Sequence, residues 1–305
     1  MSGMRKISLV ASVISSVILV SLSLAWADVD LPTKFSNQGS VGNTRHNLSQ
    51  RQLSGGGPAG VTMDQYRSDY GEVCVYCHTP HGASAAQVPL WNRTIKPTAY
   101  TTYSATGSST ITQPITQPGA NSLSCLSCHD GQTAVDSIIN MPGSGRYQAS
   151  QATSQDNAFL NTWTNPSGVG PGTHMSMNNV GCLACHAPGS FVGAGATDFT
   201  AFVIGTDLRD DHPVGIRYPT TGPNVDFKAT TATFGTMKFF DTNGNTRPDT
   251  NEIRLYDTGG VAKVECASCH DPHGVPSGGA GSVFIASFLR VSNAGSTLCL
   301  SCHVK

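Results

Sequence analysis

Apolar residues are concentrated at one place along this chain and are sparse elsewhere. Residues 7–24, ISLVASVISSVILVSLSL, form an apolar run that follows Arg5 and Lys6 and precedes AWA at residues 25–27. A positive start, an apolar stretch and an A-x-A site are typical of a secretory signal peptide, so we predict that residues 1–27 are cleaved. The run is also just long enough to span a bilayer, which leaves an uncleaved anchor as the alternative. The junction carries no cysteine for a lipid anchor.

After residue 28 there is no second apolar run, and Gly, Pro and Ser interrupt the hydrophobic pattern. We therefore predict a mostly irregular fold with single-turn helices at the cysteine motifs described below. A short strand pair is expected around residues 234–257. Residues 28–305 are predicted to form one domain, because no linker or shift in composition divides them.

The composition suggests that side chains alone do not fill the core. Hydrophobic residues make up 38% of the chain and aromatic residues 7%, while there are 33 glycines and 17 prolines. Charged residues are only 12% and the net charge is −1, which argues against charge-driven disorder and against nucleic-acid binding. Another apolar body is expected to contribute to the core.

All ten cysteines fall into five copies of one motif, C-x-x-C-H, numbered here from first to fifth. The copies are Cys74–Cys77–His78, Cys125–Cys128–His129, Cys182–Cys185–His186, Cys266–Cys269–His270 and Cys299–Cys302–His303.

C-x-x-C-H is the attachment site of a c-type haem, in which two thioether bonds hold the porphyrin and the histidine binds the iron. Three other interpretations fit less well. A redox C-x-x-C does not need the histidine, zinc sites use paired knuckles and five is odd, and disulfides do not require one fixed spacing. We predict five covalent haems that together form the apolar core.

The second axial ligand of each iron determines the chemistry, because an occupied position suits electron transfer and an open one suits catalysis. Five histidines lie outside the motifs, and we predict that they are the distal ligands. They are His46, His81, His174, His212 and His273.

His81 and His273 each follow a motif histidine by three residues, in CHTPHG and CHDPHG. This spacing is too short for either to bind the iron of its own motif. The intervening proline and the following glycine favour a sharp turn that directs the histidine to a neighbouring haem. A surface histidine in a turn is the alternative.

His212 precedes a proline, which favours an extended loop that can present a ligand. His46 and His174 have less local support, and Met175 and Met177 are alternative ligands beside His174. From the motif intervals we expect the first and second haems to form one pair and the fourth and fifth another. The third haem is expected to bridge the pairs.

Residues 241–252, DTNGNTRPDTNE, have oxygen-bearing side chains at the spacing of a calcium-binding loop. Thr246 occupies the sixth place, where glycine is usual, and strand-like sequences flank the loop. A polar hairpin without metal is the alternative. The candidate calcium ligands are Asp241, Asn243, Asn245, Asp249 and Glu252.

With these motifs in view, the chain resembles the multihaem c-type cytochromes with doubled C-x-x-C-H motifs, in particular those of metal-reducing bacteria. The segments that carry the resemblance are scattered over residues 46–305: CVYCHTPHG, DHPVG, DTNG, VECASCHDPHG and FLRVSNAGSTLCLSCH. The resemblance implies bis-histidine haems in a continuous chain for electron transfer. It also implies that some members polymerise as extracellular filaments in which one distal histidine comes from the adjacent subunit, a role that would suit His46.

We therefore expect an exported, non-enzymatic electron carrier, either an extracellular filament or a monomeric periplasmic shuttle, with the filament favoured on the resemblance. Expected partners are redox proteins, extracellular metal oxides and further copies of the chain. The rival class is a multihaem oxidoreductase enzyme with one open haem and acid–base residues above it. No motif is altered and five spare histidines are present, so no catalytic residue is predicted.

Overall fold

The computed structural model describes part of the chain, and the predicted signal peptide and His174 lie outside the described residues. Within that part, no helix is long and apolar enough to cross a membrane. The described residues are 40–48, 70, 72–85, 89–96, 98–105, 111, 113–140, 175–179, 181–189, 198–219, 226–275 and 286–304.

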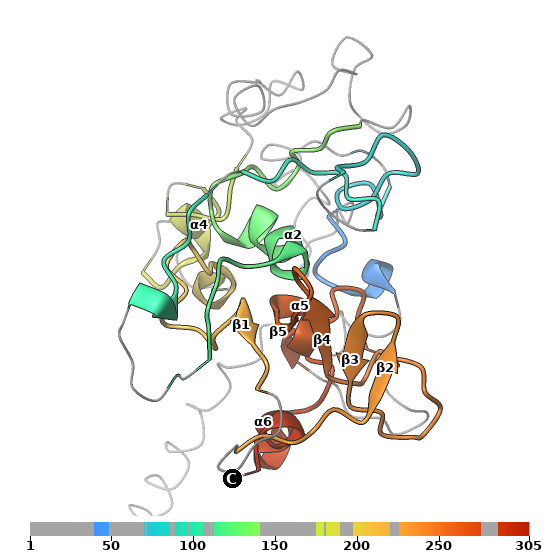
Figure 1. The fold of residues 1–305 in the computed structure, drawn as a ribbon. Coiled ribbons are helices and arrows are strands. Elements are labelled where there is room, and N and C mark those ends of the chain that lie inside the picture. Colours follow the sequence, from blue (N-terminus) through green and yellow to red (C-terminus); the bar gives the residue numbers. More distant parts are fainter. Residues whose placement is uncertain are drawn as a thin grey trace, which may run out of the picture.

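Short α-helices mark four of the five motifs (Figure 1). They are α2 (Ala120–His129), α4 (Leu183–His186), α5 (Cys266–Cys269) and α6 (Thr297–Cys302).

The prediction of single-turn helices is confirmed for α4 and α5, which have four residues each. It is wrong for α2, which has ten residues because the stretch before its cysteines contains no glycine or proline. The first motif forms a turn, closed by a hydrogen bond of 2.8 Å from the His78 N–H to the Cys74 carbonyl.

Single turns of 3-10 helix occur between these elements. They are η1 (Val41–Asn43), η3 (Tyr103–Ala105), η5 (Thr200–Phe202), η6 (Ala286–Phe288) and η7 (Ala294–Ser296).

The described β-structure is one antiparallel sheet of five strands in the order β1-β5-β4-β3-β2. The predicted strand pair is confirmed as β3 and β4, with Lys238 opposite Leu255. The other strands were not predicted because strands of two to four residues carry too little alternation to detect. The strands are β1 (Ile216–Arg217), β2 (Ala232–Phe234), β3 (Met237–Phe239), β4 (Arg254–Asp257) and β5 (Ala262–Val264).

Buried apolar side chains in the described part of the chain form three small clusters. One surrounds Tyr76 within the first motif, and a second surrounds Leu126 of α2. The third surrounds Leu255 and includes Cys302 of the fifth motif at its edge. This division agrees with the expectation that side chains alone do not build one core.

A buried carboxylate joins α2 to α5. Glu265, only 1% exposed, accepts hydrogen bonds from the Gly119 N–H at 3.0 Å and from the Ser122 hydroxyl at 2.5 Å. The Thr258 hydroxyl donates to the same carboxylate. A side chain at position 119 would clash, because its Cβ would lie 2.6 Å from Glu265 Oε1. The two helices are therefore fixed beside each other (Figure 1).

A buried guanidinium plays a similar part at the other end of α2. Arg93 is 0% exposed and donates to the hydroxyl and carbonyl of Ser127 and to the carbonyls of Ala134 and Val135. These bonds hold the end of α2 against the turn that follows it.

Replacing Glu265 by alanine should destabilise the protein by about 2–4 kcal/mol, because buried donors on Gly119 and Ser122 lose their acceptor. Denaturant unfolding followed by circular dichroism measures this change. Asp257→Asn removes an exposed carboxylate of β4 and is the control. An unchanged midpoint for E265A would contradict the role of Glu265.

The pH dependence of folding stability provides a second test of the Glu265 hydrogen bonds. Burial raises the pKa of Glu265 above its ordinary value of 4.5. The folded state therefore favours the protonated acid, and wild-type stability from this group falls as pH rises from 4.5 through the raised pKa. The difference in unfolding free energy between wild type and E265Q should change over this window.

Candidate functional site

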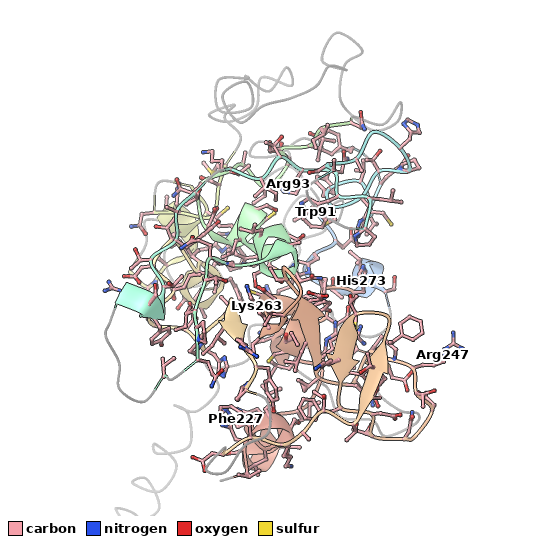
Figure 2. All side chains as sticks on the ribbon, in the orientation of Figure 1. Trp91, Arg93, Phe227, Arg247, Lys263 and His273 are labelled. Atoms are coloured by element: carbon pink, nitrogen blue, oxygen red, sulfur yellow. The ribbon has the colours of Figure 1, made fainter. Side chains whose placement is uncertain are left out.

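The structure brings the first motif and the tail of the fourth motif together. The rings of His78 and His273 have centroids 6.1 Å apart and planes within 10° of parallel. The Trp91 ring lies edge-on to the His78 ring, with centroids 5.6 Å apart. In Figure 2, Trp91 and His273 lie on the same side of the molecule. His273 therefore lies beside the histidine of another motif.

A second pair joins the N-terminal part of the described chain to α2. The rings of His46 and His129 also have centroids 6.1 Å apart, with an interplanar angle of 76°. His46 stacks on Phe288 at 4.4 Å, which holds it in this position. His46 therefore meets a histidine of its own chain.

Both distances fit two ligands of one iron. Imidazoles that bind a metal from opposite faces, each at about 2 Å, hold their centroids about 6 Å apart. An aromatic contact between the rings also falls in this range. The pairing favours ligation, because each pair joins one motif histidine to one histidine outside the motifs.

Hydrogen bonds at Nδ1 prepare these rings for a metal. A ligand histidine needs a neutral ring with one nitrogen protonated and held by an acceptor, so that the other nitrogen is free to bind. Backbone carbonyls occupy this position for five candidate ligands. The pairs are His46 with Pro272 at 3.1 Å, His78 with Pro89 at 2.9 Å, His129 with Phe202 at 2.6 Å, His212 with Pro213 at 3.2 Å and His270 with Ser287 at 2.7 Å.

The pKa values of two motif histidines agree with the neutral ring that metal binding requires. Burial lowers the pKa of His78 and of His129, which keeps both rings neutral at neutral pH. Each lowering is partly offset by the Nδ1 hydrogen bond. Neutral imidazole with a free Nε2 is the form that binds iron, so the residues fit the haem that the motifs predict.

Burial lowers the pKa of His212, and the charge of His303 in the fifth motif adds a smaller lowering. His212, the histidine predicted from DHPVG, therefore lies within electrostatic range of the fifth motif. Phe227 contacts His303 at 4.5 Å and supports its ring from the loop before β2 (Figure 2).

The remaining candidates lie elsewhere. His186 stacks on Phe199 at 3.9 Å. His81 is exposed, although its carbonyl is held by Thr79 and Asn140. Met175 and Met177 lie on the segment beside α2 and remain alternative ligands for the third motif.

The cysteines do not resemble a disulfide framework or a thiolate metal site. The nine described as free are in no disulfide, and the described residues contain no cluster of His, Cys, Asp and Glu that could hold a metal ion. Burial raises the pKa of Cys77 and of Cys269 to about 12, so both thiols are protonated at neutral pH. Neutral thiols beside a motif histidine suit thioether attachment.

The motifs are arranged around the second one. The Cys266 N–H of the fourth motif donates to the Ser122 hydroxyl of α2 at 2.8 Å. Asn92 binds the Val75 carbonyl inside the first motif, and the next residue, Arg93, binds the Ser127 carbonyl inside the second. The Asn178 amide, next to the third motif, donates to the Gly131 carbonyl at 3.0 Å. That the third haem bridges two pairs stays a prediction.

The buried Glu265 bonds described above bring the start of α2 against α5, and so the second motif beside the fourth. Val264, two residues before the fourth motif, and Cys302 of the fifth motif pack against the same buried cluster. The pairing of the fourth and fifth haems stays a prediction.

The candidate calcium loop is closed by its own side chains. Asp241 accepts hydrogen bonds from the backbone N–H groups of Gly244 and Thr246 at 2.6 and 2.9 Å. The amides of Asn243 and Asn245 both donate to Asp249 Oδ2, at 2.7 and 2.8 Å.

The sixth residue of the loop is a threonine, but its backbone has a conformation usual for glycine. Thr246 has φ +59, in the left-handed region that glycine adopts without strain. Glu252 is 0% exposed and accepts from Thr242 and from the Asp249 N–H. Thr246 thus adopts the backbone conformation that glycine would have at this place.

Comparison with known proteins identifies the end of the chain. A family model described as a doubled CXXCH motif matches residues 259–305, which contain the fourth and fifth motifs. No curated protein matches the chain. The match indicates covalently bound haem c, consistent with a cytochrome c, and haem-based electron transfer.

Three buried charged residues that support the site were not predicted: Arg93, Glu265 and Arg290. The position of Glu265 next to a cysteine motif was visible in the sequence, but its partners in α2 are 143 and 146 residues away. Such long-range contacts leave no local pattern.

Replacing His46 by alanine should open one axial position. We expect ferric wild type to be low-spin throughout, and H46A to show a high-spin signal from about one fifth of its haem, by electron paramagnetic resonance. Asn47→Ala breaks a hydrogen bond of the same turn and is the control. A fully low-spin H46A would show that His46 is not a ligand.

Proposed function

We propose that this chain carries electrons through five covalently bound haems, one at each motif, and that it is not an enzyme. The observation that carries the proposal is the pairing of His78 with His273 and of His46 with His129, each at the separation of two axial ligands. When bound, haem with two histidine ligands supplies reversible one-electron exchange at its iron.

The chain's own residues determine how the attachment sites meet. Glu265 holds the second motif against the fourth, and Arg93 holds the end of α2 on the side of the first. Close and fixed attachment sites are what a path for electrons requires. The five apolar porphyrins also complete the core that the three side-chain clusters leave divided.

The rival proposal is a multihaem oxidoreductase enzyme with one open iron. The imidazoles of His212 and His270 each donate from Nδ1 to a backbone carbonyl. This hydrogen bond favours an imidazole that binds iron over an iron with an open axial position. The spin-state measurement described for His46 also separates the two classes, because an open iron would give a high-spin signal in wild type.

We further propose that the exported chain forms extracellular filaments, with redox proteins or metal oxides as electron partners. The support is the resemblance to filament-forming cytochromes. His46 does not suit the role across a subunit boundary, because it meets His129 of its own chain. His81 suits it better, since its ring is exposed on a backbone fixed by Asn140.

Electron microscopy of the sheared extracellular fraction, with mass spectrometry on the same sample, tests this proposal. We expect filaments whose subunit carries five haem masses, and we expect H81A to abolish the filaments. Lys238→Ala changes an exposed side chain of β3 and should leave them intact. Discrete particles confined to the periplasm would instead identify a shuttle and would end the role of His81 between subunits.

We also propose that the loop of residues 241–252 binds calcium, on the basis of its ligand spacing and the left-handed Thr246. Protein purified without chelator should contain about one calcium per chain, and D249N should lose it. Asp257→Asn is the matched control outside the loop. A calcium-to-protein ratio near zero in wild type would end this proposal.

A further inference from the structure

The hydrogen-bond acceptor of His273 differs in kind from those of the five candidate ligands whose Nδ1 bonds are described above. Its Nδ1 lies 3.0 Å from a carboxylate oxygen of Asp271, whereas the five other Nδ1 bonds described above go to backbone carbonyls. His78, which faces His273, is bound to the neutral carbonyl of Pro89. The two sides of this pair are therefore chemically unequal.

The carboxylate is fixed in position by its surroundings. Asp271 is 6% exposed, and the same oxygen accepts the His273 N–H at 3.1 Å. Its other oxygen binds Arg290 Nη1 at 2.9 Å, and Arg290 is itself 3% exposed. Arg290 cannot easily swing away, because it also donates to the carbonyls of Ala267 and Thr250.

The charge on Asp271 follows from its pairing with a guanidinium. Arg290 Nη1 forms an ion pair with Asp271 Oδ2. Asp271 thus presents a carboxylate to the imidazole through Oδ1, and Arg290 offsets part of its charge from the far oxygen.

The first motif provides a comparison within the same chain. Thr79 occupies the place of Asp271 in the tail CHTPHG, and its hydroxyl donates to the carbonyl of His81 at 2.9 Å. The two tails otherwise share the sequence CH-x-PHG. The carboxylate is thus a feature of the fourth motif's tail and is not required by the turn.

A carboxylate that accepts the Nδ1 proton makes the imidazole a more basic, more electron-donating ligand. Such a ligand stabilises the oxidised iron more than the reduced iron. We propose that Asp271, acting through His273 as a positioning residue, makes the haem of the first motif the lowest-potential centre of the chain. Electrons then pass from the first motif toward the second and fourth. This inference rests on the proposed function, in which His273 is a ligand.

Spectroelectrochemical titration of the full-length haem-loaded protein tests the inference. Asp271→Asn keeps the shape of the side chain and removes its charge. One haem of D271N should shift to higher midpoint potential while the others stay, and the low-spin resonance of that haem should move. Asp257→Asn, which removes an exposed carboxylate of β4, should change neither. Titration curves of D271N that coincide with wild type would overturn the inference.

His273→Ala separates this failure from failure of the proposed function. If H273A produces a high-spin haem but D271N shifts no midpoint potential, only the inference about Asp271 is wrong. If H273A remains fully low-spin, His273 is not a ligand. Both the inference about Asp271 and the proposed pairing of His78 with His273 are then wrong.

Wild type supplies a test that does not depend on the folding of D271N. The first haem to be oxidised as the potential rises should be the one that becomes high-spin in H273A. A different haem at the lowest potential would overturn the inference.

Discussion

The hydrogen bond at imidazole Nδ1 is the interaction on which the arrangement of this chain depends. A histidine can bind a metal only through a nitrogen that is free of its proton, and the bond at the other nitrogen decides which one that is. The acceptors for His46, His129 and His270 come from Pro272, Phe202 and Ser287, in segments distant from them in sequence or belonging to another motif. The orientation of these imidazoles therefore depends on the tertiary fold.

Buried polar groups join distant segments of this chain, as packed apolar side chains do in other proteins. Arg93, Glu265 and Arg290 each join segments far apart in sequence, and each is at most 3% exposed. Buried charges are costly unless fully hydrogen-bonded, which explains why each has several partners. A chain with so few aromatic and aliphatic residues is held together by such contacts around its covalent cofactors.

The sequence was sufficient to predict the motifs, the irregular fold and the strand pair of β3 and β4, because each rests on local spacing. It also predicted that His273 points away from its own motif, and the structure places its ring beside His78 of the first motif. The contact of Cys266 with Ser122 could not be predicted, because it depends on Glu265 reaching Gly119 across 146 residues. The proximity of His46 to His129 of its own chain leaves no local pattern either.

The central place of the second motif has a consequence for the proposed electron path. The second motif adjoins the segments of the first, third and fourth, and the fourth packs on the same cluster as the fifth. The first, third and fifth motifs thus form three outer points around a shared centre. Under the proposed function, such a molecule would be a junction, and copies of it could build a branched network as readily as a single line.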